Sequence, residues 1–281
     1  MQNFEQNIAS FSTQQLNALQ PTKMWPPILY HYTSTDAMLS ILQSGKLRAS
    51  CIEQLNDKVE LRYAVSIFRA HLERFYATEQ TTEGCDLFRH IRQQVDTVDT
   101  TGVYVASFSA DGGEFGMWRL YGDRGRGFCF GFPLYKVEHW GGFPGKCHYD
   151  TTKADEFCRG ALTMVRDTLL ADVRAGTKLD LESIATTFLW QISYFGLLFK
   201  PHAWADEKEW RLIFTNRKTE IKTRSNGSTY IEIPSDDRLP IGAICAGPMC
   251  EQSSINKVQD CLQRLGLKIS LHLATAGKLK C

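Results

Sequence analysis

The stretch that most constrains the fold is 28–50, which reads ILYHYTSTDAMLSILQSGKLRAS. Its first five residues are apolar and aromatic and indicate a short strand, after which Thr33 and Ser34 offer hydroxyl caps to a helix. Gly45 is typical of the residue that ends a helix, and an alternating segment follows it. The spacing predicts a strand, a helix and a second strand, with His31 at the end of the first strand. Reactive side chains are often displayed at such ends.

Composition is that of a globular chain. The 281 residues are 43% hydrophobic and 11% aromatic, which is enough to fill a core. A net charge of +1 argues against a protein that coats nucleic acid, although it leaves room for a local basic patch. The nine cysteines include no C-x-x-C pair, so neither a zinc site nor a disulfide framework is indicated. We expect a cytoplasmic protein with no membrane partner, because the sequence has no signal peptide and no membrane-length apolar run.

Strand-like and helix-like segments are mixed along the chain. The expected strands after residue 100 are 102–109, 128–132, 209–214, 229–233, 243–247 and 268–273. The expected helices are 56–75, 86–95, 117–122, 154–174, 181–199 and 254–265, and the helix at 181–199 is apolar nearly all round and expected to be deeply buried. We predict a single α+β domain over 1–281 with mixed or antiparallel sheets. It includes an N-terminal helical leader at 1–24 and a helical insertion at 153–200.

Four ordered blocks resemble a bacterial family catalogued as a domain of unknown function, number 2971. The blocks are His31-Tyr32-Thr33-Ser34, Leu55-Asn56-Asp57-x-x-Glu60, Phe108-Ser109 with Met117-Trp118-x-x-Tyr121, and Lys200 with Trp204-x-x-Glu207-x-Glu209-Trp210-Arg211. The blocks are spread over most of the chain. The family name implies no chemistry.

The first block also resembles the first strand and helix of ADP-ribosyltransferase-like folds. That resemblance implies a split sheet that binds NAD as a substrate. A strand histidine, here His31, would hydrogen-bond the adenosine ribose, an aromatic ring would stack on nicotinamide, and a glutamate on a late strand would stabilise the ribose cation. His31 can equally be an edge or core histidine that is held by a backbone carbonyl.

Glu209 is the expected carboxylate. Alternation in the predicted strand puts Trp210 on an apolar face and puts Glu207, Glu209 and Arg211 on the other face. Glu207 competes with Glu209 for the catalytic role. The alternative is a solvated glutamate–arginine pair that contributes little.

Further residues are candidates for contact with NAD. Trp118 and Tyr121 are three apart on a predicted short helix and therefore share a face. Arginine side chains fit phosphate oxygens. With His31, the candidates for binding are Tyr32, Thr33, Ser109, Trp118, Tyr121, Arg119 and Arg211.

The expected function is therefore that of an NAD-binding ADP-ribosyltransferase-like or NAD-hydrolysing protein, of the kind used as bacterial toxins or anti-phage effectors. Its acceptor would be a protein, a nucleic acid or water, and a regulatory or inhibitory partner would restrain it. One alternative is a metal-dependent nuclease that uses Asp206, Glu207 and Glu209. Another is a non-catalytic module that binds a ligand or partner.

Overall fold

The computed structural model describes residues 25–52, 58–96, 102–215, 220–234 and 238–274, together with residues 6, 7, 10, 11, 14 and 19. The chain forms two compact units. Unit 1 comprises Met1–Met24, Asn56–Thr101 and Cys147–Ala203, and unit 2 comprises Trp25–Leu55, Gly102–Lys146 and Trp204–Cys281. The α+β fold class is confirmed. The single domain stays a prediction, and most of the expected leader at 1–24 lies outside the described residues.

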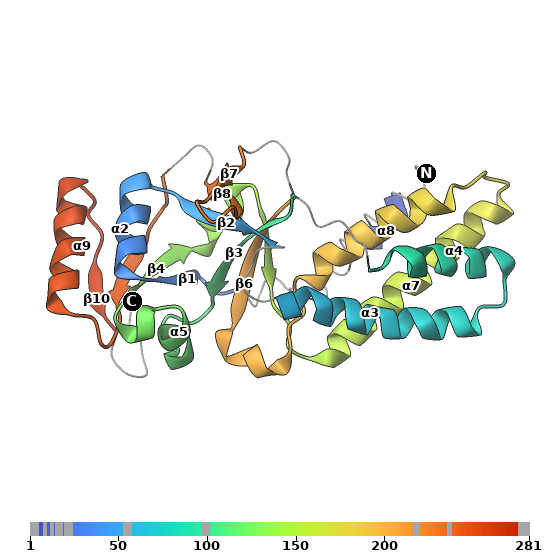
Figure 1. Cartoon of the computed structure of the whole chain (residues 1–281), viewed down its shortest axis with the longest axis horizontal. Coiled ribbons are helices and arrows are strands. Elements are labelled where there is room, and N and C mark those ends of the chain that lie inside the picture. Colours follow the sequence, from blue (N-terminus) through green and yellow to red (C-terminus); the bar gives the residue numbers. More distant parts are fainter. Residues whose placement is uncertain are drawn as a thin grey trace. The chain divides into compact units, whose positions relative to one another are not determined.

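Unit 2 holds a mixed sheet of 10 strands, all of them antiparallel to their neighbours except β10 beside β9. The main strand order is β10-β9-β4-β1-β3-β2-β8-β7, and β6 pairs with β3 and β5 (Figure 1). The strands are β1 (Ile28–Thr33), β2 (Leu47–Cys51), β3 (Tyr104–Ser109), β4 (Phe128–Pro133), β5 (Phe143–Lys146), β6 (Glu209–Phe214), β7 (Lys222–Thr223), β8 (Thr229–Ile233), β9 (Ala243–Ala246) and β10 (Leu271–Leu273).

The sheet forks at β3. Along one edge β3 pairs with β6 over its whole length, from Tyr104 to Ser109. Its other edge is shared, because β2 pairs near Tyr104 and β1 pairs only at Ser109 among the described residues. The middle of β3, around Ser107, therefore lies between two diverging strands.

Alternation gives the sheet a core face and a polar face. The core face carries the apolar side chains of β2, β3, β6 and β8, such as Phe108 and Trp210, and packs against α2 (Thr35–Ser44) and α9 (Gln252–Arg264). The residues that alternate with these side chains lie on the other face of the sheet. The register places them beside one another, because paired residues share a face. We call this second side the polar face, and it carries Arg48, Ser50, Ser107, Ser109, Glu209, Arg211 and Tyr230.

The ends of α2 follow the sequence prediction. The Ser34 hydroxyl accepts a hydrogen bond from the Ala37 N–H at 3.3 Å. Gly45 adopts a left-handed φ of 67° and donates its N–H to the Ile41 carbonyl at 2.8 Å. Both caps satisfy backbone groups that a helix end leaves open, so the strand–helix–strand unit at 28–50 is confirmed.

The remaining elements of unit 2 are short. They are α5 (Phe115–Leu120), the 3₁₀ turns at Asp123–Gly125 and Glu138–Trp140, α6 (Leu134–Val137), and a third 3₁₀ turn, His202–Glu207, which begins in unit 1 and leads into β6. The strands β5 and β7 were not predicted. β5 reads Phe-Pro-Gly-Lys and pairs with β6 in the described structure, where an edge position tolerates proline.

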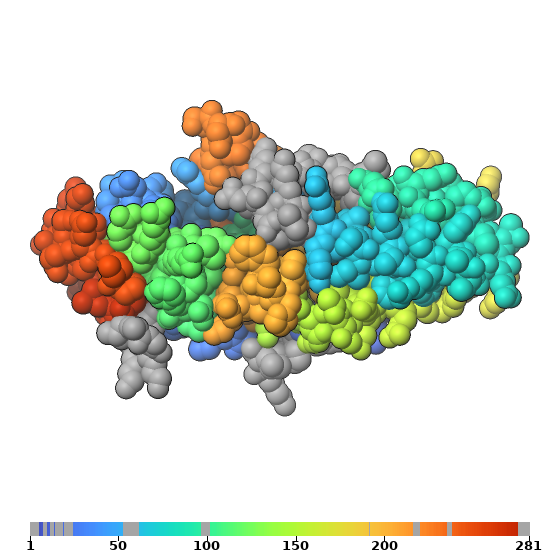
Figure 2. Space-filling view, turned by 60° about the horizontal axis from the view of Figure 1, so that its bottom comes forward, coloured from blue at the N-terminus to red at the C-terminus, as the bar shows by residue number. Residues whose placement is uncertain are grey.

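Unit 1 is built from α3 (Lys58–Thr78), α4 (Thr82–Gln94), α7 (Thr151–Arg174) and α8 (Leu181–Gly196). Figure 2 shows α3 and α4 beside α7 on the surface of this unit. The helices enclose a separate apolar core that includes Phe88, Phe157 and Phe188. The helix expected at 181–199 is deeply buried at residues such as Ile184, Phe188 and Phe195, but Trp190 is 40% exposed. In the described structure, no helix is both long and apolar enough to cross a membrane.

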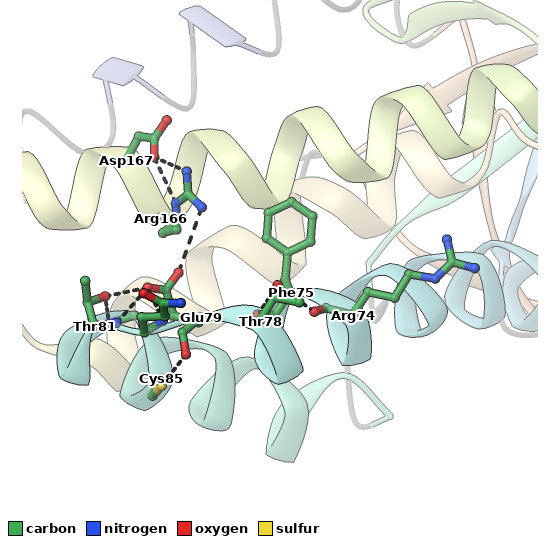
Figure 3. A network of polar contacts seen from close by, with 10 residues as sticks. Arg74, Phe75, Thr78, Glu79, Thr81, Cys85, Arg166 and Asp167 are labelled. Atoms are coloured by element: carbon green, nitrogen blue, oxygen red, sulfur yellow. Dashed lines mark hydrogen bonds and ion pairs between the residues drawn. The ribbon is translucent and has the colours of Figure 1, made fainter.

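The start of α4 also differs from the prediction. The helix begins at Thr82 rather than Asp86, because Thr81 caps it with its hydroxyl. Gly84 therefore lies inside the helix. A Cβ at this position would lie 2.7 Å from side-chain atoms of both Glu79 and Thr81, so a glycine fits here. Figure 3 shows Glu79 over this helix end, reached by Arg166 of α7.

Candidate functional site

Glu209 and Arg211 form a buried ion pair on the polar face. Nε and Nη2 of Arg211 donate to the two oxygens of Glu209 at 2.9 and 3.1 Å. The two residues are 5% and 2% exposed, respectively. The expected strand and its aromatic opposite face are confirmed, but the pair is buried rather than solvated. A carboxylate held by two of the three nitrogens of a guanidinium is largely neutralised, so Glu209 is poorly suited to stabilise a substrate cation.

Glu207 has different surroundings from Glu209. Lys208 takes a positive φ of 46°, so the alternation of β6 does not extend back to Glu207. The Glu207 Oε1 accepts a hydrogen bond from the Tyr121 hydroxyl at 2.7 Å. Glu207 is 5% exposed, whereas Tyr121, which follows α5, is 47% exposed. A nearly buried carboxylate is thus linked to the surface by one aromatic side chain.

The loop after β3 is tied to the turn before β6. The Ser109 hydroxyl donates to the Glu207 carbonyl at 2.7 Å and accepts from the Asp111 N–H at 3.1 Å. Nζ of Lys208 lies 2.7 Å from Asp111 Oδ2 and 3.7 Å from Glu114 Oε2. Ser109 has no exposed surface, and its two hydrogen bonds position the loop.

The pKa of Asp111 is lowered and the pKa of Lys208 is raised. Burial acts to raise the pKa of the Asp111 carboxyl, but hydrogen bonds from Lys208 and the Gly113 N–H outweigh it and lower the pKa below its usual value. The hydrogen bond to Asp111 raises the pKa of Lys208. Both groups are therefore charged at neutral pH and hold the two segments together.

Tyr32 and Trp118 belong to a small buried cluster on the polar side of β1 and β4. Their rings meet edge to face at 4.8 Å, and the Tyr32 hydroxyl donates to the Asp111 carbonyl at 2.7 Å. Burial raises the pKa of Tyr32, which keeps this donor protonated. Trp118 is 2% exposed, so its ring is packed inside this cluster, and its contact with nicotinamide stays a prediction. Thr33 is buried as well.

His31 lies on the opposite side of β1. It pairs with Phe130 of β4 and meets the Phe108 ring edge to face at 5.8 Å, and both rings belong to the core face. Its Nδ1 lies 3.0 Å from the Ser107 carbonyl, which can only accept, so Nδ1 carries the proton. Burial lowers the pKa of His31 against the opposing effect of this bond, and the ring is neutral at pH 7.

The structure brings some predicted residues together and separates others. Tyr32, Ser109, Trp118, Tyr121 and Glu207 lie around the loop after β3. Tyr30 pairs with Ser109, and Ser109 pairs with Glu209, so the core-facing His31 does not share a face with Glu209.

Sequence reasoning missed Asp111, Glu114 and Lys208. The sequence signal for this loop was Asp111 followed by Gly112 and Gly113. These residues form a turn in which the Gly113 N–H donates to Asp111 Oδ1 at 2.8 Å. Arg119 lies exposed on α5 beside this loop. Among the described residues, no group of three or more His, Cys, Asp or Glu is placed to hold a metal ion.

Comparison with known proteins links part of the chain to one family. No curated protein and no solved structure matches it, so the resemblance to ADP-ribosyltransferase-like folds stays a prediction. Residues 117–212 match the family described as Protein of unknown function (DUF2971), a span that includes the Trp118–Tyr121 and Trp204–Arg211 motifs.

Proposed function

We propose that this protein binds NAD and cleaves its bond between nicotinamide and ribose, with Glu207 rather than Glu209 as the catalytic carboxylate. The observation that carries the proposal is the hydrogen bond from half-exposed Tyr121 to nearly buried Glu207. Tyr121 offers an accessible ring on which nicotinamide can stack. The carboxylate accepts a hydrogen bond from the hydroxyl of that ring, and in this proposal it faces the reacting ribose carbon.

The reaction breaks the bond between the nicotinamide nitrogen and ribose C1′. The electron pair of that bond leaves with nicotinamide, and positive charge develops on the ribose. A fixed carboxylate stabilises this charge most strongly where water is scarce, as around Glu207. Water, or the hydroxyl or amine of an acceptor, then bonds to C1′ and loses a proton.

His31 and Arg119 have secondary roles in this proposal. With its proton on Nδ1, neutral His31 has an Nε2 lone pair that can accept a hydrogen bond from a ribose hydroxyl. This contact requires the substrate to reach the fork between β1 and β3, where His31 bonds to Ser107. Arg119 is exposed on α5, and in this proposal its guanidinium binds phosphate oxygens of NAD.

The test is release of nicotinamide from NAD by the purified protein, alone and with cell extract. Glu207→Gln keeps the size of the side chain and should lower release by about 100-fold or more, because it removes the stabilising charge. Glu209→Gln is the matched control, and its release per folded molecule should stay close to that of the parent. Equal release from the Glu207→Gln variant would overturn the assignment. No release from the parent, together with no NAD-dependent thermal shift, would overturn the function.

A second candidate is a non-catalytic module that binds a regulatory ligand or a partner. The pairing of Glu209 with Arg211 and of His31 with a backbone carbonyl favours it, because both are contacts that hold a fold together. It predicts that Glu207→Gln leaves biological activity intact and that Glu209→Gln lowers activity only as far as it destabilises the fold.

A further inference from the structure

Two arginines meet at one tyrosine on the polar face of unit 2. Arg48 of β2 places its Cζ 4.7 Å from the centre of the Tyr230 ring. Arg224, in the turn between β7 and β8, places its Cζ 5.3 Å from the same ring centre. Figure 1 shows β2, β8 and β7 adjacent at this end of the sheet.

A serine hydroxyl joins the cluster. Ser50 pairs directly with Tyr230 in the register and accepts a hydrogen bond from Nη2 of Arg224 at 3.1 Å. Arg48 lies two residues before Ser50 in the same strand, so its side chain leaves the same face. Both guanidinium groups therefore converge on one patch of β2. We call Arg48, Ser50, Arg224 and Tyr230 the arginine patch.

The positive charge of the patch has no counter-ion among the described residues. Glu232 is the carboxylate that the register places opposite Arg48, but its Oε2 is bound by Lys222 Nζ at 2.7 Å. Neither Arg48 nor Arg224 forms an ion pair in the described part of the chain. Like charges held close together repel, and an anion between them reverses that effect.

Contact with the Tyr230 ring explains the positions of the two guanidinium groups, but the ring does not accept the hydrogen bonds that their N–H groups can donate. Each guanidinium has five N–H groups in a planar fork that matches phosphate oxygens. In the described structure Arg224 donates one of them, to Ser50, and Arg48 donates none to the protein. Tyr230 is only 8% exposed, so a nucleobase cannot stack on its ring. The patch can therefore recognise a phosphate group, and it offers no aromatic surface to a base.

We propose that the arginine patch is a binding site for a phosphate group, carried by a free phosphate ester or by the backbone of a nucleic acid. This site uses residues other than Tyr121 and Glu207, and the proposal does not depend on NAD cleavage. Arg48 and Arg224 supply forked donors to the phosphate oxygens, while Ser50 and Tyr230 fix the direction of the guanidinium groups.

The experiment is calorimetric titration of the full chain with inorganic phosphate, a nucleoside monophosphate and a single-stranded oligonucleotide. Arg48→Gln and Arg224→Gln should each weaken binding of whichever probe binds by about tenfold or more, because each removes charge-assisted hydrogen bonds. Arg264→Gln is the matched control, since Arg264 is an exposed arginine on α9, away from the patch in sequence and on another element. It should bind like the parent.

The probe that binds identifies the compound that carries the phosphate group. Binding of the oligonucleotide with a strong salt dependence identifies a nucleic-acid backbone, and binding of the mononucleotide alone identifies a phosphate ester. Arg48→Lys keeps the charge without the fork and should bind between the parent and Arg48→Gln. The proposal is overturned when no probe binds to the parent, or when the correctly folded double Arg48→Gln, Arg224→Gln variant binds as the parent does.

Discussion

Changing Glu79 to glutamine should destabilise unit 1 in a pH-dependent way. Oε1 of Glu79 accepts three hydrogen bonds, from the Gln80 N–H at 3.0 Å, the Thr81 N–H at 2.9 Å and the Thr81 hydroxyl at 2.7 Å (Figure 3). Nη1 of Arg166 lies 3.9 Å from the other oxygen, and the Glu79 side chain is 7% exposed. One carboxylate thus joins the end of α3, the cap of α4 and the side of α7.

The magnitude follows from these contacts. A hydrogen bond to a charged group contributes about 1.5–3 kcal/mol, and glutamine keeps an oxygen but loses the charge. We therefore expect a loss of about 1–2 kcal/mol at pH 7, or a fall in Tm of about 4–8 °C for a unit of this size. Burial acts to raise the pKa of Glu79, but the hydrogen bonds from Thr81 and Gln80 and the charge of Arg166 lower it on balance.

The sign of the pH effect follows from this lowered pKa. The stabilisation is present above the pKa of the unfolded chain and is lost as the pH falls through the pKa of the folded state. Thermal unfolding followed by far-ultraviolet circular dichroism should therefore separate the parent from Glu79→Gln at pH 7, and by less at an acid pH well below about 4.3, the usual pKa of a glutamate. Glu156→Gln, on the exposed side of α7, is the control and should not shift. An equal difference at both pH values would refute the reasoning.

Three further changes test the packing. Gly127→Ala should lower the free energy of unfolding by about 3 kcal/mol or more, because the added carbon would overlap the Thr33 carbonyl. Urea denaturation measures this loss, and unchanged stability would contradict the close approach. Gly84→Ala should lower the Tm of unit 1, since its new methyl would lie 2.7 Å from the side chains of Glu79 and of Thr81, which caps α4. An unshifted Tm would show that these side chains move aside freely. Glu209→Gln should lower the free energy of unfolding by about 3–5 kcal/mol, because it removes one charge from a buried ion pair. Replacing both residues with apolar ones should cost less, and the reverse order would contradict this reasoning.

Local patterns determined much of the fold. Ser34 and Gly45 mark the ends of α2 because capping depends on residues within one helical turn. The alternation of Trp210 with Arg211 predicted the two faces of β6, since side chains of a strand alternate whatever lies on either side. The strand–helix–strand unit at 28–50 was readable for the same reason.

Tertiary contacts decided the site. Tyr121 reaches Glu207 across 86 residues, and no local pattern records that meeting. Glu207 and Glu209 are chemically identical and two residues apart, yet one faces a half-exposed tyrosine and the other a buried arginine. Whether a charged side chain can act on a ligand depends on its burial and on nearby counter-charges. Both are set by strands that pair from distant parts of the chain. The sequence therefore predicted a carboxylate at the start of β6, while only the packed sheet distinguished the carboxylate bonded to a half-exposed tyrosine from the one paired with a buried arginine.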